Sequence, residues 1–392
     1  MSDTTDGAAS NTTDGTAPTI TPGELHRTVS AGEQVSILDL RDRDEVETWR
    51  IDGEGVTLTQ APMMRFIAAE ATGGVGALAS ELGLRAPVVA VCGEGEASDH
   101  VAGLLNEAGI EARNLAGGME AWARLYTAAE IEAVGPTVVQ YHRPSSGCLS
   151  YMIVAGDEAV VVDPLRAFVD RYVEDAAERG VSIIAAVDTH VHADHVSGVR
   201  DLAAETGARP VVPAGAVDRG LAFETETIED GAEIEVGETS IRALHAPGHT
   251  TEMTALDIGG VVLSGDSLSL GSVARPDLER GSDGARDLAE QLHGTLEDLL
   301  ALPGETLVAP GHVAPDADPD AGGTYTATLG GLRERLDFLG LDREAFVDRI
   351  LGDMPPRPAN YERIIAANLG REDIGTAEAF ELELGPNNCA VS

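Results

Sequence analysis

The chain has 392 residues, 43% of them hydrophobic, which predicts two domains and is too apolar for a disordered acidic chain. The chain has 67 Asp and Glu residues but only 26 cationic residues, all of them Arg, so the formal net charge is −41. A polyanion of this strength is repelled by phosphate backbones and by anionic lipid surfaces, which excludes nucleic-acid and peripheral membrane partners.

The N-terminal third predicts a tail followed by a small domain. Residues 1–21 are rich in Ser, Thr, Asp and Gly and lack periodicity, so we predict a disordered acidic tail, without the basic and apolar regions of a signal peptide. In residues 22–127, short apolar runs (SILDL, PVVAV) alternate with amphipathic stretches (ASDHVAGLLNEAG, GGMEAWARLY). This alternation predicts a small parallel α/β domain. Residues 127–137, TAAEIEAVGPT, are interpreted as a linker.

The second domain is predicted over residues 138–327, where β-rich halves flank helices. Expected strands are YMIVAG, AVVVDP, SIIAAVDTH, PVVPA, EIEVG, SIRALHA, MTALDIG, VVLSGD and TLVAPGH, and expected helices lie at 167–179, near 197–207 and at 285–302. This pattern predicts a layered α/β sandwich. Residues 328–392, interrupted by several prolines, are interpreted as a helical C-terminal appendage.

Potential metal ligands gather where predicted strands end. The motif THVHADH places His190, His192, Asp194 and His195 within six residues of one another, at the point where a strand runs into a loop. Strand alternation directs the first two histidines to one side, and the following turn brings the other two residues round. Further candidate ligands at strand ends are His249 in APGHT, Asp266 in LSGDSL and His312 in APGH. Glycine before two of these histidines permits close backbone approach. So many imidazoles and carboxylates predict a metal centre.

In this order the motifs THVHADH, APGHT, SGD and PGH resemble the metallo-β-lactamase superfamily, whose fold is a four-layer αβ/βα sandwich, over about residues 138–315. The resemblance implies two possible ligand sets. A dinuclear site with two Zn or Fe ions would activate water for hydrolysis, with His190, His192 and His249 on one metal, Asp194, His195 and His312 on the other, and Asp266 bridging. A mononuclear Fe(II) site, as in persulfide dioxygenases of the superfamily, would use His190, His249 and Asp266. The ligand types alone leave both open.

Flanking sequence favours the dioxygenases. The segment SLSLGSVARPDL after Asp266 resembles the one that follows the last iron ligand in persulfide dioxygenases. The segments GCLSYMIVAGDEAVVVDP and MPPRPANYERIIAAN resemble chains that fuse this domain to a rhodanese. The resemblance places Arg275 and Asp277 near the iron pocket, where they would orient the substrate or the ligands; a surface ion pair is the alternative. Cys148 is expected to line the core or the pocket, and Cys389 to be incidental.

A cysteine loop marks the first domain. Cys92 follows the strand PVVAV and precedes GEGEAS and a helix, so loop amides and the helix dipole are expected to stabilise its thiolate. With LDLRDRDEVETWR and NLAGGMEAW, this loop resembles rhodanese, and Cys92 falls on the sulfur-carrying position. Active rhodanese loops carry arginine, whereas this one carries Glu94 and Glu96, which repel anionic sulfur donors. A working sulfurtransferase and a regulatory or docking domain both remain open.

Three functions follow from these features. The first is an iron-dependent persulfide dioxygenase that oxidises a low-molecular-weight thiol persulfide with O2 to sulfite and thiol, coupled to the rhodanese-like domain. The second is a dinuclear-metal thioester hydrolase of the glyoxalase II type. The third is a sulfur carrier or binding module without turnover. Related dioxygenases suggest a homodimer.

The charge also bears on the cellular setting. At about 1 M salt the Debye length falls to roughly 3 Å, which screens the self-repulsion of so acidic a surface. We therefore expect a protein of the high-salt cytoplasm of a halophile, most simply a haloarchaeon. The sequence has only three cysteines and no apolar run of about 18 residues, so neither a disulfide framework nor a membrane span is expected.

Overall fold

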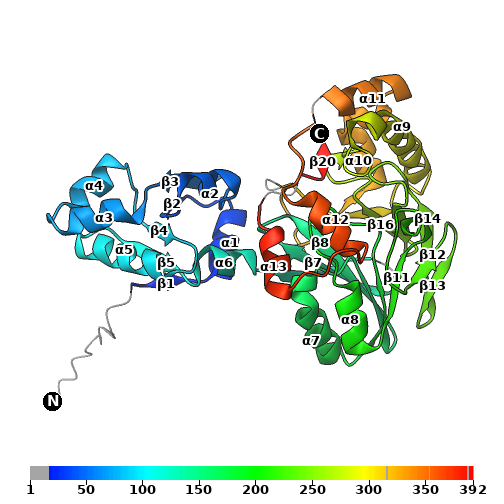
Figure 1. Ribbon diagram of the computed structural model, residues 1–392, viewed down its shortest axis with the longest axis horizontal. Helices are drawn as coiled ribbons and strands as arrows, with labels where there is room; N and C mark the ends of the chain where they lie inside the picture. The colour runs from blue at the N-terminus through cyan, green and yellow to red at the C-terminus, as the bar shows by residue number, and fades with distance from the viewer. Residues whose placement is uncertain (1–16, 134, 315–316, 353, 386–387, 392) are drawn as a thin grey trace, which may run out of the picture. The chain divides into compact units, whose positions relative to one another are not determined.

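The computed structural model describes residues 17–133, 135–314, 317–352, 354–385 and 388–391. The chain forms two compact units, Met1–Leu125 and Tyr126–Ser392 (Figure 1). Most of the tail predicted at 1–21 lies outside the described residues. Its last residues are not disordered: strand β1 (Thr19–Ile20) pairs with a neighbouring strand, and Thr21 caps the first helix. A strand of this length carries no periodic pattern, so the sequence could not reveal it.

The first unit is a parallel α/β domain, as predicted. Its strands are β1, β2 (Val35–Asp39), β3 (Val56–Gln60), β4 (Val88–Val91) and β5 (Ala112–Leu115), in the all-parallel order β1-β5-β4-β2-β3. Its helices are α1 (Pro22–Ser30), α2 (Arg43–Thr48), α3 (Met63–Glu70), α4 (Val75–Glu81), α5 (Glu96–Glu107) and α6 (Gly118–Ala123). Two apolar cores, one on each sheet face, cover both sides of this sheet. Because these parallel strands are covered on both faces, their sequences SILDL and PVVAV are almost continuously apolar.

The second unit contains two main sheets. The seven-stranded sheet is formed by β6 (Thr127–Ile131), β7 (Thr137–Arg143), β8 (Cys148–Ala155), β9 (Glu158–Val162), β10 (Ser182–Val187), β11 (Arg209–Pro213) and β12 (Glu226–Ile228), with strands adjacent in sequence order. The six-stranded sheet has the order β13 (Glu233–Val236), β14 (Thr239–His245), β15 (Thr254–Asp257), β16 (Val261–Gly265), β18 (Leu307–Pro310) and β19 (Ala327–Thr328). The linker predicted at 127–137 is wrong in part, because β6 pairs with β7 at the sheet edge.

Helices cover the outer face of each sheet, so the second unit has four layers. They are η1 (Arg166–Phe168), α7 (Val169–Arg179), α8 (Val199–Thr206), η2 (Ala214–Ala216), α9 (Gly281–Leu300), α10 (Leu329–Arg335), η3 (Asp337–Gly340) and α11 (Arg343–Gly352). Along β9, Val160 and Val162 face the core between the sheets, whereas Ala159 and Val161 face α7 and α8. Helices α9 to α11 pack on the six-stranded sheet (Figure 1). The predicted αβ/βα sandwich is confirmed.

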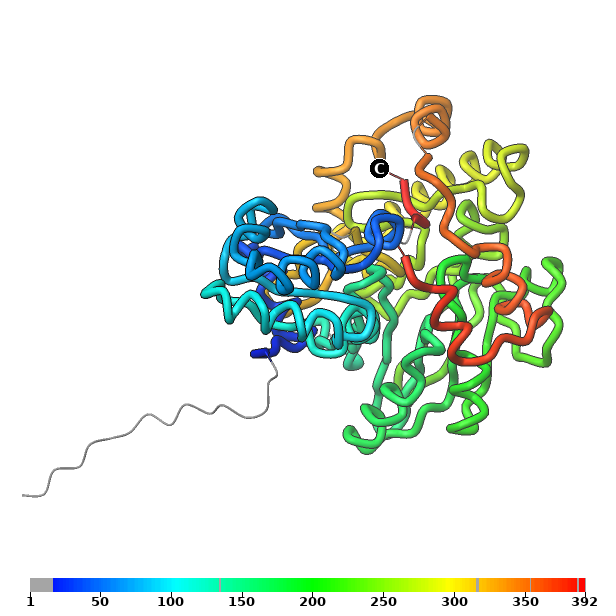
Figure 2. Tube along the Cα trace, turned by 60° about the vertical axis from the view of Figure 1, so that its left-hand side comes forward, coloured from blue at the N-terminus to red at the C-terminus, as the bar shows by residue number. Residues whose placement is uncertain are grey.

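The C-terminal residues are part of this second unit and not an appendage. Residues 354–385 and 388–391, here called the C-terminal segment, contain α12 (Tyr361–Asn368), α13 (Thr376–Leu382) and β20 (Ala390–Val391). Strand β20 pairs with β17 (Val273–Ala274), and Figure 2 shows the orange-to-red segment lying against green segments of the same unit. Prolines break its helical pattern, so its docking was not visible in the sequence. Across the described residues, no helix combines the length and apolar character needed to cross a bilayer.

Candidate metal centre

The predicted ligands come from strand ends that the fold brings together. The ligand loop, residues 188–198, connects β10 to α8 and carries His190, His192, Asp194 and His195. On the other sheet, His249 follows β14, Asp266 directly follows β16, and His312 lies two residues after β18. All of these side chains are buried. The two sheets therefore contribute to one buried cluster, which falls into three groups of potential donor atoms.

The first group consists of two imidazoles and one carboxylate. Its atoms are Nε2 of His190, Nε2 of His249 and Oδ2 of Asp266, and all lie within 4.8 Å of one another. The carboxylate oxygen is 3.7 Å from the first nitrogen and 3.4 Å from the second. Within the described part of the chain, none of these three buried atoms has a hydrogen-bond partner. We call them the open donor atoms. Because unpartnered buried polar atoms are costly, they fit a bound cation.

The opposite atom of each of these side chains is held. Nδ1 of His190 lies 2.9 Å from Oγ1 of Thr189, whose hydroxyl donates to Asp163 at 2.9 Å. Nδ1 of His249 lies 3.0 Å from the carbonyl oxygen of Arg275. A carbonyl only accepts, and a hydroxyl that already donates accepts as well, so both rings carry their proton on Nδ1. The lone pair on Nε2 of each ring is then available to bind a metal ion.

The other carboxylate oxygen of Asp266 is hydrogen-bonded. Its Oδ1 atom lies 2.5 Å from Nδ1 of His312, whereas Oδ2 is an open donor atom. Burial raises the pKa of this carboxyl, but the charge and hydrogen bond of His312 outweigh burial and leave the pKa below its ordinary value. Burial lowers the pKa of His190 well below its ordinary value, and His192 and His249 lower it further. The first group therefore offers a neutral imidazole and an ionised carboxylate.

The second group consists of Cys148, Asp194, His195 and His312. Its members contact one another directly. Oδ2 of Asp194 lies 2.9 Å from Nε2 of His312, 3.2 Å from Nδ1 of His195 and 3.3 Å from the thiol of Cys148. Burial lowers the pKa of both imidazoles, but carboxylates outweigh burial and raise each well above its ordinary value. A cation here would have to displace those protons.

His192 belongs to neither of these groups. Its Nε2 atom lies 3.1 Å from Asp163 and 3.8 Å from Asp188, which form the third group with it. Asp163 thus contacts His192 directly and His190 through Thr189. Asp163 was not predicted as a site residue, although it stands at the end of the apolar strand AVVVDP, where an acidic residue is a recognisable signal.

Close approach at the two glycines is confirmed. A Cβ atom on Gly311 would lie 2.8 Å from Oδ1 of Asp266, and one on Gly248 would lie 2.4 Å from Cβ of Leu292. Gly248 also has a φ of 143°, which side chains rarely adopt. These glycines therefore let His249 and His312 reach the cluster.

Comparisons with known proteins agree with this geometry. The sequence profile of the metallo-beta-lactamase superfamily matches residues 143–312, and that of the rhodanese-like domain matches residues 21–125. A hydroxyacylglutathione hydrolase of Methylococcus capsulatus is 33% identical over 61% of this chain and 88% of its own length. The chain belongs to the metallo-beta-lactamase superfamily. Its first unit is a rhodanese-like domain.

One further relative is named a persulfide dioxygenase, and a solved structure carries the same name ETHE1. The human mitochondrial persulfide dioxygenase ETHE1 is 29% identical over 59% of this chain and 86% of its own length. The crystal structure of ETHE1 from Myxococcus xanthus superposes with a TM-score of 0.51 at 28% identity, covering 59% of this chain and 98% of that one. This superfamily member is thus similar to both dioxygenases and hydrolases.

The Arg275–Asp277 pair is buried, so the surface alternative is wrong. Nε of Arg275 donates to Oδ1 of Asp277 at 2.7 Å, and Arg357 donates to Oδ2 at 2.8 Å. The other side of the Arg275 guanidinium donates to the carbonyls of Pro356 and Asn388 at 2.8 and 2.9 Å. The pair therefore fastens the C-terminal segment, and among the hydrogen bonds of the described residues it is the backbone carbonyl of Arg275 that contacts a predicted metal ligand.

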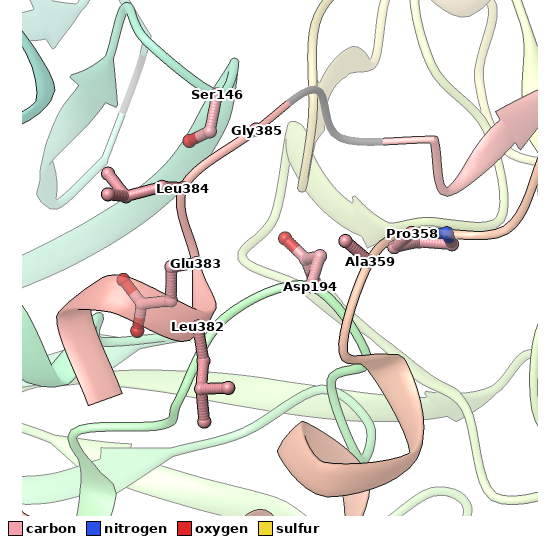
Figure 3. A pocket seen from close by; sticks show the side chains of 8 residues that line it. All are labelled: Ser146, Asp194, Pro358, Ala359, Leu382, Glu383, Leu384 and Gly385. Atoms are coloured by element: carbon pink, nitrogen blue, oxygen red, sulfur yellow. The ribbon is translucent and has the colours of Figure 1, made fainter. Parts of the chain in front are cut away.

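A small cavity of about 20 Å³ opens beside Asp194. Figure 3 shows Pro358 and Ala359 on one side of Asp194 and Leu382 to Gly385 on the other, so the C-terminal segment forms most of the wall. A space of this size holds about one water molecule.

In the rhodanese-like domain, the predicted cradle around Cys92 is present. Its sulfur accepts from the backbone N–H of Gly95 at 3.1 Å and from the hydroxyl of Ser98 at 3.1 Å, at the N-terminus of α5. Cys92 is buried, whereas Glu94 and Glu96 point to solvent. The sulfur is therefore held by a backbone N–H and a hydroxyl, and the two acidic side chains lie on the surface.

Proposed function

We propose that the protein is a persulfide dioxygenase that holds one Fe(II) ion at His190, His249 and Asp266. The open donor atoms carry this proposal. Two imidazoles and one carboxylate with free coordination positions are the ligand set of non-haem Fe(II) oxygenases. A ferrous ion in such a site supplies the positions at which dioxygen and substrate react. The second donor group supports one metal rather than two, because Asp194 already contacts both His195 and His312 and raises the pKa of each, although Nε2 of His195 has no hydrogen-bond partner among the described residues.

The reaction balances for a small thiol persulfide. RSSH, O2 and H2O give RSH, sulfite and two protons, and four electrons pass from the outer sulfur to dioxygen. In this scheme Thr189 and the carbonyl of Arg275 hold the two imidazoles in the tautomer that exposes Nε2, and His312 holds Asp266 so that one oxygen stays available.

The rhodanese-like domain gives this chemistry a sulfur source. A cysteine cradled by two N–H groups and a hydroxyl can carry a sulfane sulfur, and exposed Glu94 disfavours anionic donors. We propose that Cys92 loads, unloads or senses the sulfur that the metallo-beta-lactamase domain oxidises. Sulfur chemistry is then the shared purpose of the two domains.

A thioester hydrolase of the hydroxyacylglutathione hydrolase type is the second candidate. It is favoured by the second donor group, which supplies Asp194, His195 and His312 for another metal, and by Asp266, whose two oxygens face the two groups. The Methylococcus relative carries this name.

One preparation can separate the two reactions. The protein is purified in high salt, loaded with ferrous iron, and supplied with a small-thiol persulfide or a lactoyl thioester, each in air and under argon. We expect sulfite only from the persulfide and only in air. Thioester cleavage that proceeds equally in air and under argon, with no sulfite from the persulfide, would assign the chain to the hydrolases.

A further inference from the structure

One amide side chain of the C-terminal segment holds the ligand loop at three points. Asn368, the last residue of α12, donates from Nδ2 to the carbonyls of His192 at 3.0 Å and His195 at 2.8 Å. Its Oδ1 accepts from the backbone N–H of Ser197 at 2.8 Å. The side chain is buried, and both of its N–H groups are used. Asn368 therefore supplies hydrogen bonds that the loop, lying between β10 and α8, cannot obtain from a strand or helix.

A carboxylate of the same segment holds the next peptide group. Oε1 of Glu383 accepts from the N–H of Val196 at 2.8 Å, and Oε2 accepts from Arg143 at 2.7 Å. Both partners of this ion pair are 1% exposed. The guanidinium of Arg143 also lies over the rings of Phe168 and Phe380, at 5.5 and 5.2 Å. Glu383 is thus fixed by its own partners and is a rigid anchor for the loop.

The other histidine of the first donor group is linked to the same segment. The carbonyl of Arg275 contacts His249, and the backbone N–H of Arg275 donates to the carbonyl of Cys389 at 3.0 Å. Its guanidinium donates to Pro356 and Asn388, as described above. The C-terminal segment therefore reaches His190 through the ligand loop and His249 through Arg275.

We propose that Asn368 and Glu383 are positioning residues of the metal centre, and that the docked C-terminal segment is required for tight metal binding. Buried peptide groups without partners are costly, so a loop that loses these contacts rearranges to recover them. Such a rearrangement moves His190 away from His249 and Asp266. The inference rests on the part of the proposed function that places a metal at these ligands; it does not depend on which reaction follows.

The test is the metal affinity of the metal-free full-length protein, measured by anaerobic titration with Co(II) or Fe(II). We expect Asn368→Ala to weaken binding by about 10- to 100-fold, the range seen when partners of metal ligands are removed. Asn360→Gly is the matched control: Asn360 directly precedes the same helix, its side chain donates to the carbonyl of Leu382 and to no metal-centre residue in the described part of the chain, and its φ of 61° is one that glycine adopts readily. We expect this control to bind metal as the wild type does.

The outcomes are distinct. A folded Asn368→Ala protein with wild-type metal affinity overturns the proposal, as does an equal loss in Asn360→Gly. If Asn368→Ala does not fold, Glu383→Gln decides, since glutamine keeps one acceptor oxygen and can satisfy Arg143 or Val196 but not both. Unchanged affinity in that variant then overturns the proposal, and weaker binding supports it. The titration contains neither persulfide nor dioxygen, so its result does not depend on whether the protein is active as a dioxygenase.

Discussion

The carbonyl oxygen of Arg275 lies 3.0 Å from Nδ1 of His249, while its guanidinium holds two carbonyls of the C-terminal segment. One residue thus sets the proton position on a predicted metal ligand and fastens the chain end. The sequence resemblance placed Arg275 near the iron pocket, where it would orient the substrate or the ligands. Its hydrogen bonds favour the second of these roles and add one in holding the fold.

Thr189 offers a direct test of tautomer control. Replacing it by valine keeps the shape but removes the hydroxyl between Asp163 and His190, so Nδ1 loses its acceptor. We expect Thr189→Val to lower metal affinity by about 10- to 100-fold, measured by titration of the metal-free protein. Thr189→Ser, which keeps the hydroxyl, should bind close to the wild type. Equal affinities in the two variants would contradict this role.

Two histidines four residues apart form a matched pair. His249 supplies an open donor atom, whereas His245 is exposed at the end of β14 and contacts the carbonyl of Thr251. We expect His249→Ala to lower the metal affinity by more than about 100-fold, which exceeds the loss seen when a residue that only contacts a metal ligand is removed. This variant should also lose persulfide-dependent oxygen uptake. His245→Ala should keep both. Metal content by atomic absorption and oxygen uptake together check this, and a metal-replete His249→Ala protein would exclude the assignment.

The buried Asp277 carboxylate predicts a pH-dependent contribution to stability. Burial raises its pKa, but Arg275 and Arg357 outweigh burial and leave the pKa below its ordinary value. Such a group stabilises the fold above its unfolded pKa of about 3.9, and the contribution disappears as the pH falls through the folded pKa. We expect Asp277→Asn to lower the free energy of unfolding by about 3 kcal/mol at pH 7, and the difference to shrink below about pH 4.

Urea unfolding in high salt measures this effect. Asp52→Asn is the control, because the Arg50–Asp52 pair has the same spacing but both side chains are about half exposed. An exposed pair of this kind contributes about 0–1 kcal/mol. A difference between Asp277→Asn and the wild type that stays constant down to pH 2 would show that ionisation of Asp277 is not its source.

Local patterns predicted many of the strands and the residues of the buried cluster, but they missed the interior strand β7 and the residues that hold the cluster. Strand-end histidines and carboxylates, with glycine before His249 and His312, predicted a buried metal centre because each signal lies within a few residues. Asn368 carried no such signal, since its partners lie 171 to 176 residues away and its amide could equally have faced solvent. Strands β1 and β6 were missed for a related reason: edge strands are short or polar and depend on their neighbours.

Cys92 should be separable from the metal chemistry. After exposure to a sulfane-sulfur donor, the wild type should gain the mass of one sulfur atom. Cys92→Ser should gain none, because Gly95 and Ser98 then surround a hydroxyl instead of a thiol. Metal content and oxygen uptake with a small-thiol persulfide should stay at wild-type values. If this variant lost oxygen uptake on the small substrate, the proposed division between the two domains would be wrong.

The charge predicts salt-dependent stability. With a formal net charge of −41, repulsion between carboxylates opposes folding wherever the Debye length is long, about 10 Å at 0.1 M salt against 3 Å at 1 M. We expect the urea midpoint to rise over this range of potassium chloride concentrations. A midpoint that is independent of salt would argue against adaptation to a salt-rich cell interior.

Oxygen consumption with a counted metal tests the iron assignment most directly. The protein, loaded with ferrous iron in high salt, is analysed for iron and zinc per chain and then given a small-thiol persulfide in an oxygen electrode. We expect about one iron per chain, held by the first donor group, and one sulfite for each O2 consumed, as the balanced reaction requires. Two metals per chain without persulfide-dependent oxygen uptake would contradict the dioxygenase assignment.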